Sequence, residues 1–230
     1  MALNKEVFKT RALTALIFVV IMLAGLFING YTFTILFTVI MFGCLYEFAK
    51  IVKIIKPKGY RVYLVFALPY IILPLIMYIS LGIDLSKNDI DFKKYSYLFP
   101  CGIIFSIWIN DTMQYLVGSL IGKTPFSKIS PKKTWEGTIG GSILCVVIIG
   151  LLEYFLPIAK SLSVKHWIAI ASICAIFGTL GDLLESKIKR LAGVKDSGNF
   201  MPGHGGFLDR FDSLLVAAPF VWLYVQIFVV

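Results

Sequence analysis

The most regular feature of the sequence is a series of long, almost uninterrupted apolar stretches separated by polar connections. A helix needs about 20 apolar residues to cross the hydrocarbon core of a bilayer. Backbone groups inside that core must pair internally, and continuous apolar runs achieve this as helices. We therefore predict an all-α, polytopic transmembrane helical bundle of about seven spans, at residues 12–28, 31–49, 62–82, 97–122, 137–156, 166–184 and 213–230.

The first apolar stretch is short and follows the basic residues Lys5, Lys9 and Arg11, as the core of a secretory signal would. No small-residue cleavage site follows it. We therefore expect a retained first span, joined to the second by a tight turn at Asn29 and Gly30.

The polar connections differ in charge. The N-terminal tail and the connections at 50–61, 123–136 and 185–212 hold 17 of the 22 lysines and arginines, and the connections on the other side hold the remaining five. Basic connections stay on the cytoplasmic side of a membrane. We therefore expect a cytoplasmic N-terminus and a site that faces the cytoplasm. The membrane that we expect is a bacterial-type plasma membrane.

The composition supports a membrane protein and narrows the candidate chemistry. Hydrophobic residues make up 58% of the chain, charged residues 15%, and the mean hydropathy is +0.85, which excludes a soluble globular domain. The four cysteines fall singly inside predicted spans, which favours packing over metal binding. The net charge of +9 is explained by the basic connections, and no aromatic-interleaved basic module indicates nucleic-acid binding.

Acidic residues gather in the last basic connection. Asp182 and Glu185 share one helical face with Ser186 and Lys189, and Asp209 and Asp212 share a face of the helix that opens the last span. Carboxylates from two helices at one membrane surface are hard oxygen ligands suited to Mg²⁺. We predict a divalent cation site there.

A glycine-rich run lies between these acidic pairs, at residues 202–206. Glycine allows positive φ and lets backbone N–H groups approach a phosphate. The surrounding cations would neutralise charge on a leaving pyrophosphate. Together these features predict a polyphosphate site, and the cations are Lys187, Lys189, Arg190, Lys195 and Arg210.

Two further segments carry polar residues. The basic connection after the fourth span offers Ser130, Lys132 and Lys133 as phosphate donors, although an interfacial loop anchored by a tryptophan fits equally well. Asp111 lies inside the fourth span, where an ionised group costs roughly 2.5 to 3.5 kcal/mol. Asn110 precedes it, and its helical face continues through Gln114, Tyr115 and Gly118, so we expect a polar stripe that faces the bundle interior. Glu47 and Glu153 lie near span ends, where snorkelling explains them.

These motifs resemble those of the phosphatidate cytidylyltransferase family, the CDP-diglyceride synthetases. Residues 130–137 and 110–115 are similar to two of its recurrent motifs, and the likeness extends over roughly 108–214. The chain looks shorter than typical members by one or two N-terminal helices, and Gln114 stands where many relatives carry a small residue. The family's long signature resembles a spaced series formed by Ser186, Lys189, Arg190, Lys195, Asp196, Pro202, His204, Gly205, Gly206, Asp209, Arg210 and Asp212.

The resemblance implies an enzyme that converts CTP and phosphatidic acid to CDP-diacylglycerol and pyrophosphate in phospholipid biosynthesis. It implies N-terminal transmembrane helices over 1–96 and a catalytic transmembrane region over 97–230, in one integrated membrane domain. A homodimer is left open as a further assembly. The cofactor would be Mg²⁺, with room for a second cation, held by Asp182, Asp209 and Asp212.

Roles follow from the same resemblance. The catalytic group would comprise Asp182, Lys189, Asp209, Asp212 and Asp111. The substrates would contact Ser130, Lys132, Lys133, Ser186, Arg190, Lys195, Asp196, His204, Gly205, Gly206 and Arg210.

Two other functions remain open at this point. A CTP-dependent polyprenol or dolichol kinase would use a similar site and transfer the γ-phosphoryl group instead. An ion transporter would explain Asp111 and the basic connections, but the acids lie on one side and inverted halves are missing.

Overall fold

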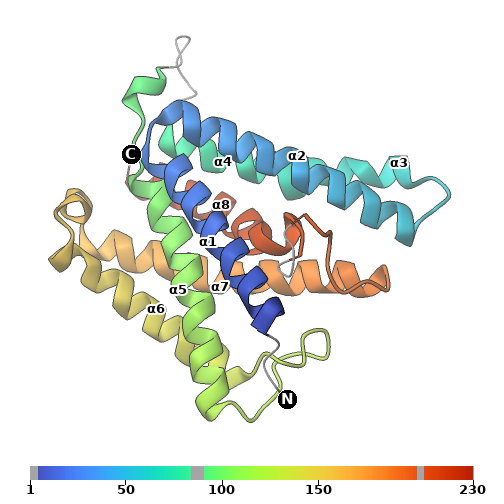
Figure 1. Cartoon of the computed structure of the whole chain (residues 1–230). Helices are drawn as coiled ribbons and strands as arrows, with labels where there is room; N and C mark the ends of the chain where they lie inside the picture. The colour runs from blue at the N-terminus through green and yellow to red at the C-terminus, as the bar shows by residue number, and fades with distance from the viewer. Residues whose placement is uncertain (1–4, 84–90, 201–204, 230) are drawn as a thin grey trace. The chain divides into compact units, whose positions relative to one another are not determined.

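The computed structural model describes residues 5–83, 91–200 and 205–229, which are mostly helical and contain no strand. Figure 1 shows the helices in order along the chain. The predicted all-α class is confirmed. The chain forms two compact units: Met1–Tyr97 with Ile188–Phe211, and Leu98–Lys187 with Asp212–Val230. The organisation into N-terminal transmembrane helices over 1–96 and a catalytic transmembrane region over 97–230 stays a prediction.

The first unit begins with a helical hairpin of α1 (Lys5–Phe27) and α2 (Gly30–Ile55). The predicted turn between them is present. Asn29 caps α2 by accepting a 2.9 Å hydrogen bond from the Thr32 amide, and the Thr32 hydroxyl accepts one from the Asn29 amide in return. This reciprocal pair satisfies two N–H groups that a helix start leaves open.

A proline-interrupted span follows α2. It comprises α3 (Tyr60–Tyr63), a 3₁₀ turn (Leu64–Phe66), a π turn (Leu68–Ile72) and α4 (Leu73–Gly82). Pro69 and Pro74 lack the N–H that a regular helix needs, and the Leu73 amide bonds to the Leu68 carbonyl five residues back. The span runs beside α2 in Figure 1, with Phe33 and Phe37 of α2 and Tyr78 of α4 fully buried between them.

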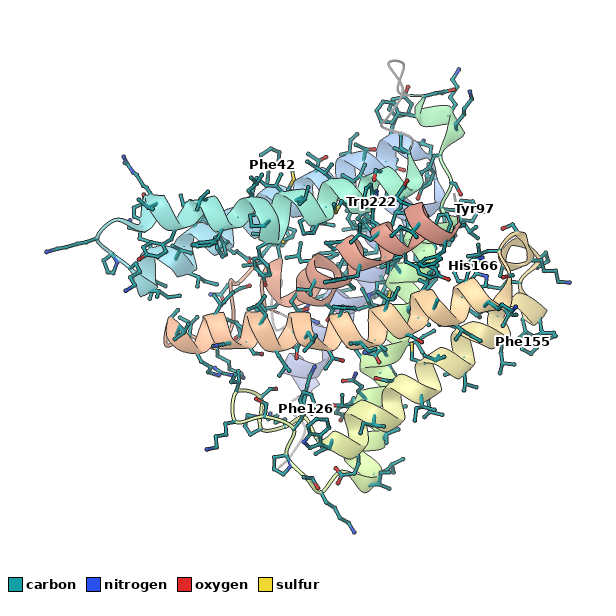
Figure 2. All side chains as sticks on the ribbon, turned by 180° about the vertical axis from the view of Figure 1, so that it is seen from behind. Phe42, Tyr97, Phe126, Phe155, His166 and Trp222 are labelled. Carbon is teal, nitrogen blue, oxygen red and sulfur yellow. The ribbon has the colours of Figure 1, made fainter. Side chains whose placement is uncertain are left out.

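The second unit contains α5 (Leu98–Ile121), α6 (Trp135–Phe155), α7 (Val164–Leu191, up to Lys187) and α8 (Leu208–Phe228, from Asp212). Glycines bring α5 and α6 together, because a Cβ on Gly137 or Gly141 would overlap backbone atoms of α5. Figure 2 shows Phe126 in the loop before α6 and Phe155 at the far end of that helix. Between α7 and α8, the rings of Phe177 and Phe220 stack with their centroids 3.6 Å apart.

Five helical segments are long and apolar enough to cross a membrane, among the residues that the structure describes. They are Gly30–Ile55, Tyr60–Gly82, Trp135–Leu152, Val164–Leu191 and Leu208–Phe228, and they coincide with five of the predicted spans. The chain is thus a multi-pass membrane protein. The total of seven spans and the cytoplasmic N-terminus stay predictions, since the described part of the first span is the shorter helix Ala12–Phe27 and α5 is too polar to qualify.

Candidate active site

Asp209, in the first turn of α8, accepts hydrogen bonds at both of its carboxylate oxygens. Its Oδ1 accepts from Lys189 Nζ at 2.6 Å, and its Oδ2 accepts from the amides of Ser197 and Gly206 at 2.8 Å each. The Ser197 hydroxyl lies 2.9 Å from the same Oδ2. Only 12% of the Lys189 side chain and 7% of the Asp209 side chain are exposed, so this ion pair is largely screened from solvent.

The glycine-rich run folds around that carboxylate. Gly205 has φ of +84°, as predicted for a glycine turn, and a Cβ there would also overlap the Asp209 carboxylate. The Gly206 amide donates to Asp209 at 2.8 Å, and the contact of the run's amides with a phosphate stays a prediction. His204 and Pro202 lie outside the described residues.

Glu47 of α2 is a site residue that sequence reasoning missed. The snorkelling interpretation is wrong, since Glu47 is only 4% exposed. It accepts hydrogen bonds from the amides of Phe207 and Leu208 at 3.0 Å each and from the Ser197 hydroxyl at 2.7 Å. The available signal was a carboxylate within an apolar stretch, the same signal that singled out Asp111.

In the second unit, a group of carboxylates forms where α7 meets α8. Gly181 has no room for a Cβ against the Asp212 backbone, so the two helices touch beside Asp182. Asp212 lies within electrostatic range of Asp182, Glu185 and Asp111. Glu185 is 2% exposed and Asp212 is 8% exposed. The predicted meeting of acids from α7 and α8 is therefore present for these residues.

A lysine from the loop before α6 reaches this acidic group. Lys133 Nζ lies 2.5 Å from Asp182 Oδ2, with 24% and 27% of the two side chains exposed. The loop is held by Glu136, which accepts from the amides of Lys123 and Thr124 at 3.2 and 3.1 Å, and by Thr134, which caps α6. The loop that carries residues 130–137 thus contacts the acidic group of α7 and α8 through Lys133.

The polar stripe on α5 is only partly as predicted. Asn110 and Gln114 are buried, and Gln114 donates to the Thr179 hydroxyl at 2.8 Å. Asp111 and Tyr115 are exposed, so the prediction that they face the bundle interior is wrong. The helix turns about 100° per residue, so the face that buries Asn110 and Gln114 leaves its neighbours outside.

The remaining predicted residues divide by burial. Ser186 is buried and Ser130 is half-buried. Arg190 is exposed and donates to the Val194 carbonyl at 3.1 Å. The other exposed members are Lys132, Lys195, Asp196 and Arg210.

The metal assignment was based on acids that fall in different units, Asp209 in the first and Asp182 and Asp212 in the second. Their convergence stays a prediction. Within the described ranges, no three His, Cys, Asp or Glu side chains are grouped closely enough to form a metal site by themselves. The four cysteines are free and buried, as expected for packing residues.

The sequence model of the Cytidylyltransferase family matches residues 72–228, well over half of the chain. The chain belongs to this family. The match includes all the predicted site residues and leaves Glu47 outside it.

Curated relatives are 39–46% identical to this chain over about half of its length. The phosphatidate cytidylyltransferase of Bacillus subtilis is 39% identical over 144 residues, which cover 61% of this chain and 51% of the relative. The Staphylococcus haemolyticus enzyme of the same name is 46% identical over 114 residues, 49% of this chain and 43% of the relative. Phosphatidate cytidylyltransferase 4, chloroplastic, of Arabidopsis thaliana is 45% identical over 117 residues, which cover 51% of this chain and 29% of the relative. The aligned part of the chain thus spans at most about half the length of these cytidylyltransferases.

Proposed function

We propose that the chain is a phosphatidate cytidylyltransferase, which converts CTP and phosphatidic acid to CDP-diacylglycerol and pyrophosphate. The observation that carries the proposal is the contact between Lys133 and Asp182, because it joins two separate motifs of the sequence in one polar site. Relatives with 39–46% identity bear this enzyme's name.

In the proposed reaction, a phosphate oxygen of phosphatidic acid attacks the α-phosphorus of CTP. The bond from the α-phosphorus to the oxygen that bridges to the β-phosphorus breaks, and pyrophosphate leaves with that oxygen and its electron pair. Such a transfer requires positioning and charge stabilisation more than covalent help from the protein. The residues must therefore hold two anionic substrates in line and offset the charge on the departing pyrophosphate.

The chain's cations suit these tasks. Lys189 is largely buried and Lys133 partly buried beside carboxylates, which keep their ammonium groups in place. We propose that they neutralise substrate phosphates, together with the more exposed Lys132, Arg190 and Lys195. Exposed cations are free to reorient toward a soluble nucleotide, and the site would face the cytoplasm, where CTP is found.

The acids of the second unit fit Mg²⁺. Asp182, Glu185 and Asp212 offer the hard oxygen atoms that this ion prefers, and their mutual proximity is unfavourable without a nearby cation. We propose Asp182 and Asp212 as ligands, with Asp209 as a third and a second cation alongside. The bound metal would neutralise charge on the triphosphate.

Product analysis tests the proposal against lipid phosphorylation. Purified protein is incubated with phosphatidic acid, Mg²⁺ and CTP labelled at the α-phosphate. Label that enters the lipid, with release of pyrophosphate, supports cytidylyl transfer. Label that stays in CDP, when a polyprenol replaces phosphatidic acid, would instead identify a lipid kinase.

A homodimer also stays a prediction, and light scattering of the solubilised protein measures the oligomeric state.

A further inference from the structure

Glu47 lies on α2, far along the chain from residues 197–208, yet its carboxylate accepts three hydrogen bonds from them. Both of its oxygens accept hydrogen bonds from residues 197–208, across as many as 161 positions of sequence. A buried carboxylate is costly unless donors surround it. The function described above gives Glu47 no role, and it lies outside the matched segment of the family.

The first task of Glu47 is to cap α8. Helix α8 begins at Leu208, and its opening N–H groups have no partners within the helix. Glu47 accepts from the amides of Phe207 and Leu208, and the Ser197 hydroxyl accepts from the Asp209 amide at 3.3 Å. Three consecutive amides are thus satisfied by side chains from elsewhere in the chain. A negative charge at this end is also favoured by the helix dipole.

Its second task concerns Asp209. The Ser197 hydroxyl lies 2.7 Å from Glu47 Oε2 and 2.9 Å from Asp209 Oδ2, so it bridges the two carboxylates. One hydroxyl carries one proton and donates it to one of the two oxygens at a time. Glu47 therefore influences which hydrogen bonds Asp209 accepts, and it also holds the turn of helix that carries Asp209.

Two glycines leave space for the Glu47 carboxylate. The three atoms nearest to a Cβ built on Gly198 all belong to the Glu47 side chain, and the same is true of Gly206. Both would overlap the carboxylate, and neither glycine has a positive φ. Their lack of a side chain is therefore required by Glu47 and not by backbone conformation.

We propose that Glu47 is a positioning residue for the catalytic carboxylate Asp209. It fixes the N-terminus of α8 and, through Ser197, the orientation of the Asp209 side chain. This inference rests on the proposed function for the part that concerns catalysis. The capping geometry it invokes does not depend on the reaction.

Glu47→Gln tests the proposal, because the amide has the same size but its nitrogen cannot accept from Leu208 or Ser197. Loss of a group that orients a metal ligand costs about 10- to 100-fold in metal affinity. We expect the Mg²⁺ concentration for half-maximal activity to rise about tenfold. Direct Mn²⁺ binding to the metal-free protein, followed by electron paramagnetic resonance, should weaken by a similar factor.

Lys53→Ala is the matched control on the same helix. Lys53 is exposed and, unlike Lys50, does not border the pocket of about 210 Å³ beside Glu47. The control should keep the wild-type Mg²⁺ response and Mn²⁺ affinity. A merely structural role for Glu47 would lower the amount of active enzyme and leave both metal constants unchanged, which would overturn the proposal. If the wild-type protein showed no cytidylyl transfer, the proposed function would be wrong. The Mn²⁺ affinities of the wild type and of Glu47→Gln would still test the role of Glu47.

A double-mutant cycle provides a second measurement. Gly198→Ala alone should lower activity and thermal stability, because the methyl group displaces the Glu47 carboxylate. In a Glu47→Ala background the same methyl group has room, so its further effect should be small. This non-additivity is what directly coupled residues show. Equal losses in both backgrounds would mean that Gly198 is required for another reason, and the proposed arrangement would be wrong.

Discussion

The two acidic regions of this protein differ in what surrounds their carboxylates. In the first unit, Asp209 and Glu47 accept hydrogen bonds from amides, a hydroxyl and a lysine. In the second unit, Asp212 is buried within range of other acids, and the Asp182 partner is the loop residue Lys133. The carboxylates of the first region are surrounded by donors of the chain itself. In the second region the carboxylates repel one another, and Lys133 offsets only part of their charge. We infer that the first region holds one proposed metal ligand, Asp209, in a fixed orientation, whereas the second region supplies the other two, Asp182 and Asp212.

The largest expected effect comes from the centre of the hydrogen-bonded region. Asp209→Asn removes the charge that pairs with Lys189 and replaces one acceptor with a donor. We expect activity to fall by more than about a hundredfold, with the protein still inserted in the membrane. Activity per inserted molecule, measured in membranes, checks this. Asp91→Asn, at a more exposed carboxylate of the same unit, serves as control, and near-normal turnover of Asp209→Asn would defeat the assignment.

Lys133 provides a test of the acidic region. Lys133→Ala removes the ammonium that contacts Asp182, and we expect a loss of about tenfold to a hundredfold in kcat/KM for CTP. Its neighbour Lys132 is exposed, so Lys132→Ala should change the same constant by about twofold. Similar losses in both variants would show that the loop acts only through its overall charge.

The contrast between the regions also predicts an unusual effect on stability. Asp212→Asn removes one charge from a group of acids, so in the presence of EDTA we expect its Tm to equal or exceed that of the wild type by about 2–4 °C. Activity should nevertheless be lost, a trade-off common at functional sites. Added Mg²⁺ should raise the Tm of the wild type more than that of the variant. A lower Tm for Asp212→Asn in EDTA would show that the acids do not destabilise each other.

The smallest effect is expected at the end of α2, outside both regions. Lys56 is exposed and belongs to the basic connection that we interpret as a membrane anchor. Lys56→Ala should change kcat/KM by less than about twofold. Steady-state assays with CTP and phosphatidic acid measure this, and a large loss would extend the functional surface to this connection.

The sequence was sufficient to predict the helices and one of the two acidic regions. Long apolar runs determine helices in a membrane, and a spacing of three or four residues places Asp182 and Glu185 on one face of α7. The meeting of α7 with α8 beside Gly181 then followed from the expectation that both acidic pairs lie at one membrane surface. Patterns within short segments of the sequence are therefore enough to predict the helices and the acidic face of α7.

Two features could not be predicted from local patterns. The contacts of Glu47 lie about 150 to 161 residues away along the chain, and no periodicity encodes such a pairing. Asp111 and Glu47 are both acids in apolar stretches, and the position of Glu47 near a span end favours a snorkelling side chain. The structure reverses this assignment, since Glu47 is buried and Asp111 is exposed. Burial of a polar group depends on the tertiary donors available to it.

The cap on α8 has a consequence for biosynthesis. Helix α2 leaves the ribosome long before α8, because Glu47 and Phe207 are 160 positions apart in the sequence. At typical translation speeds this interval lasts on the order of ten seconds. During that time α2 must enter the bilayer with a carboxylate whose final donors do not yet exist. Until residues 197–208 have been synthesised, water, lipid headgroups or the insertion machinery must therefore solvate the Glu47 carboxylate.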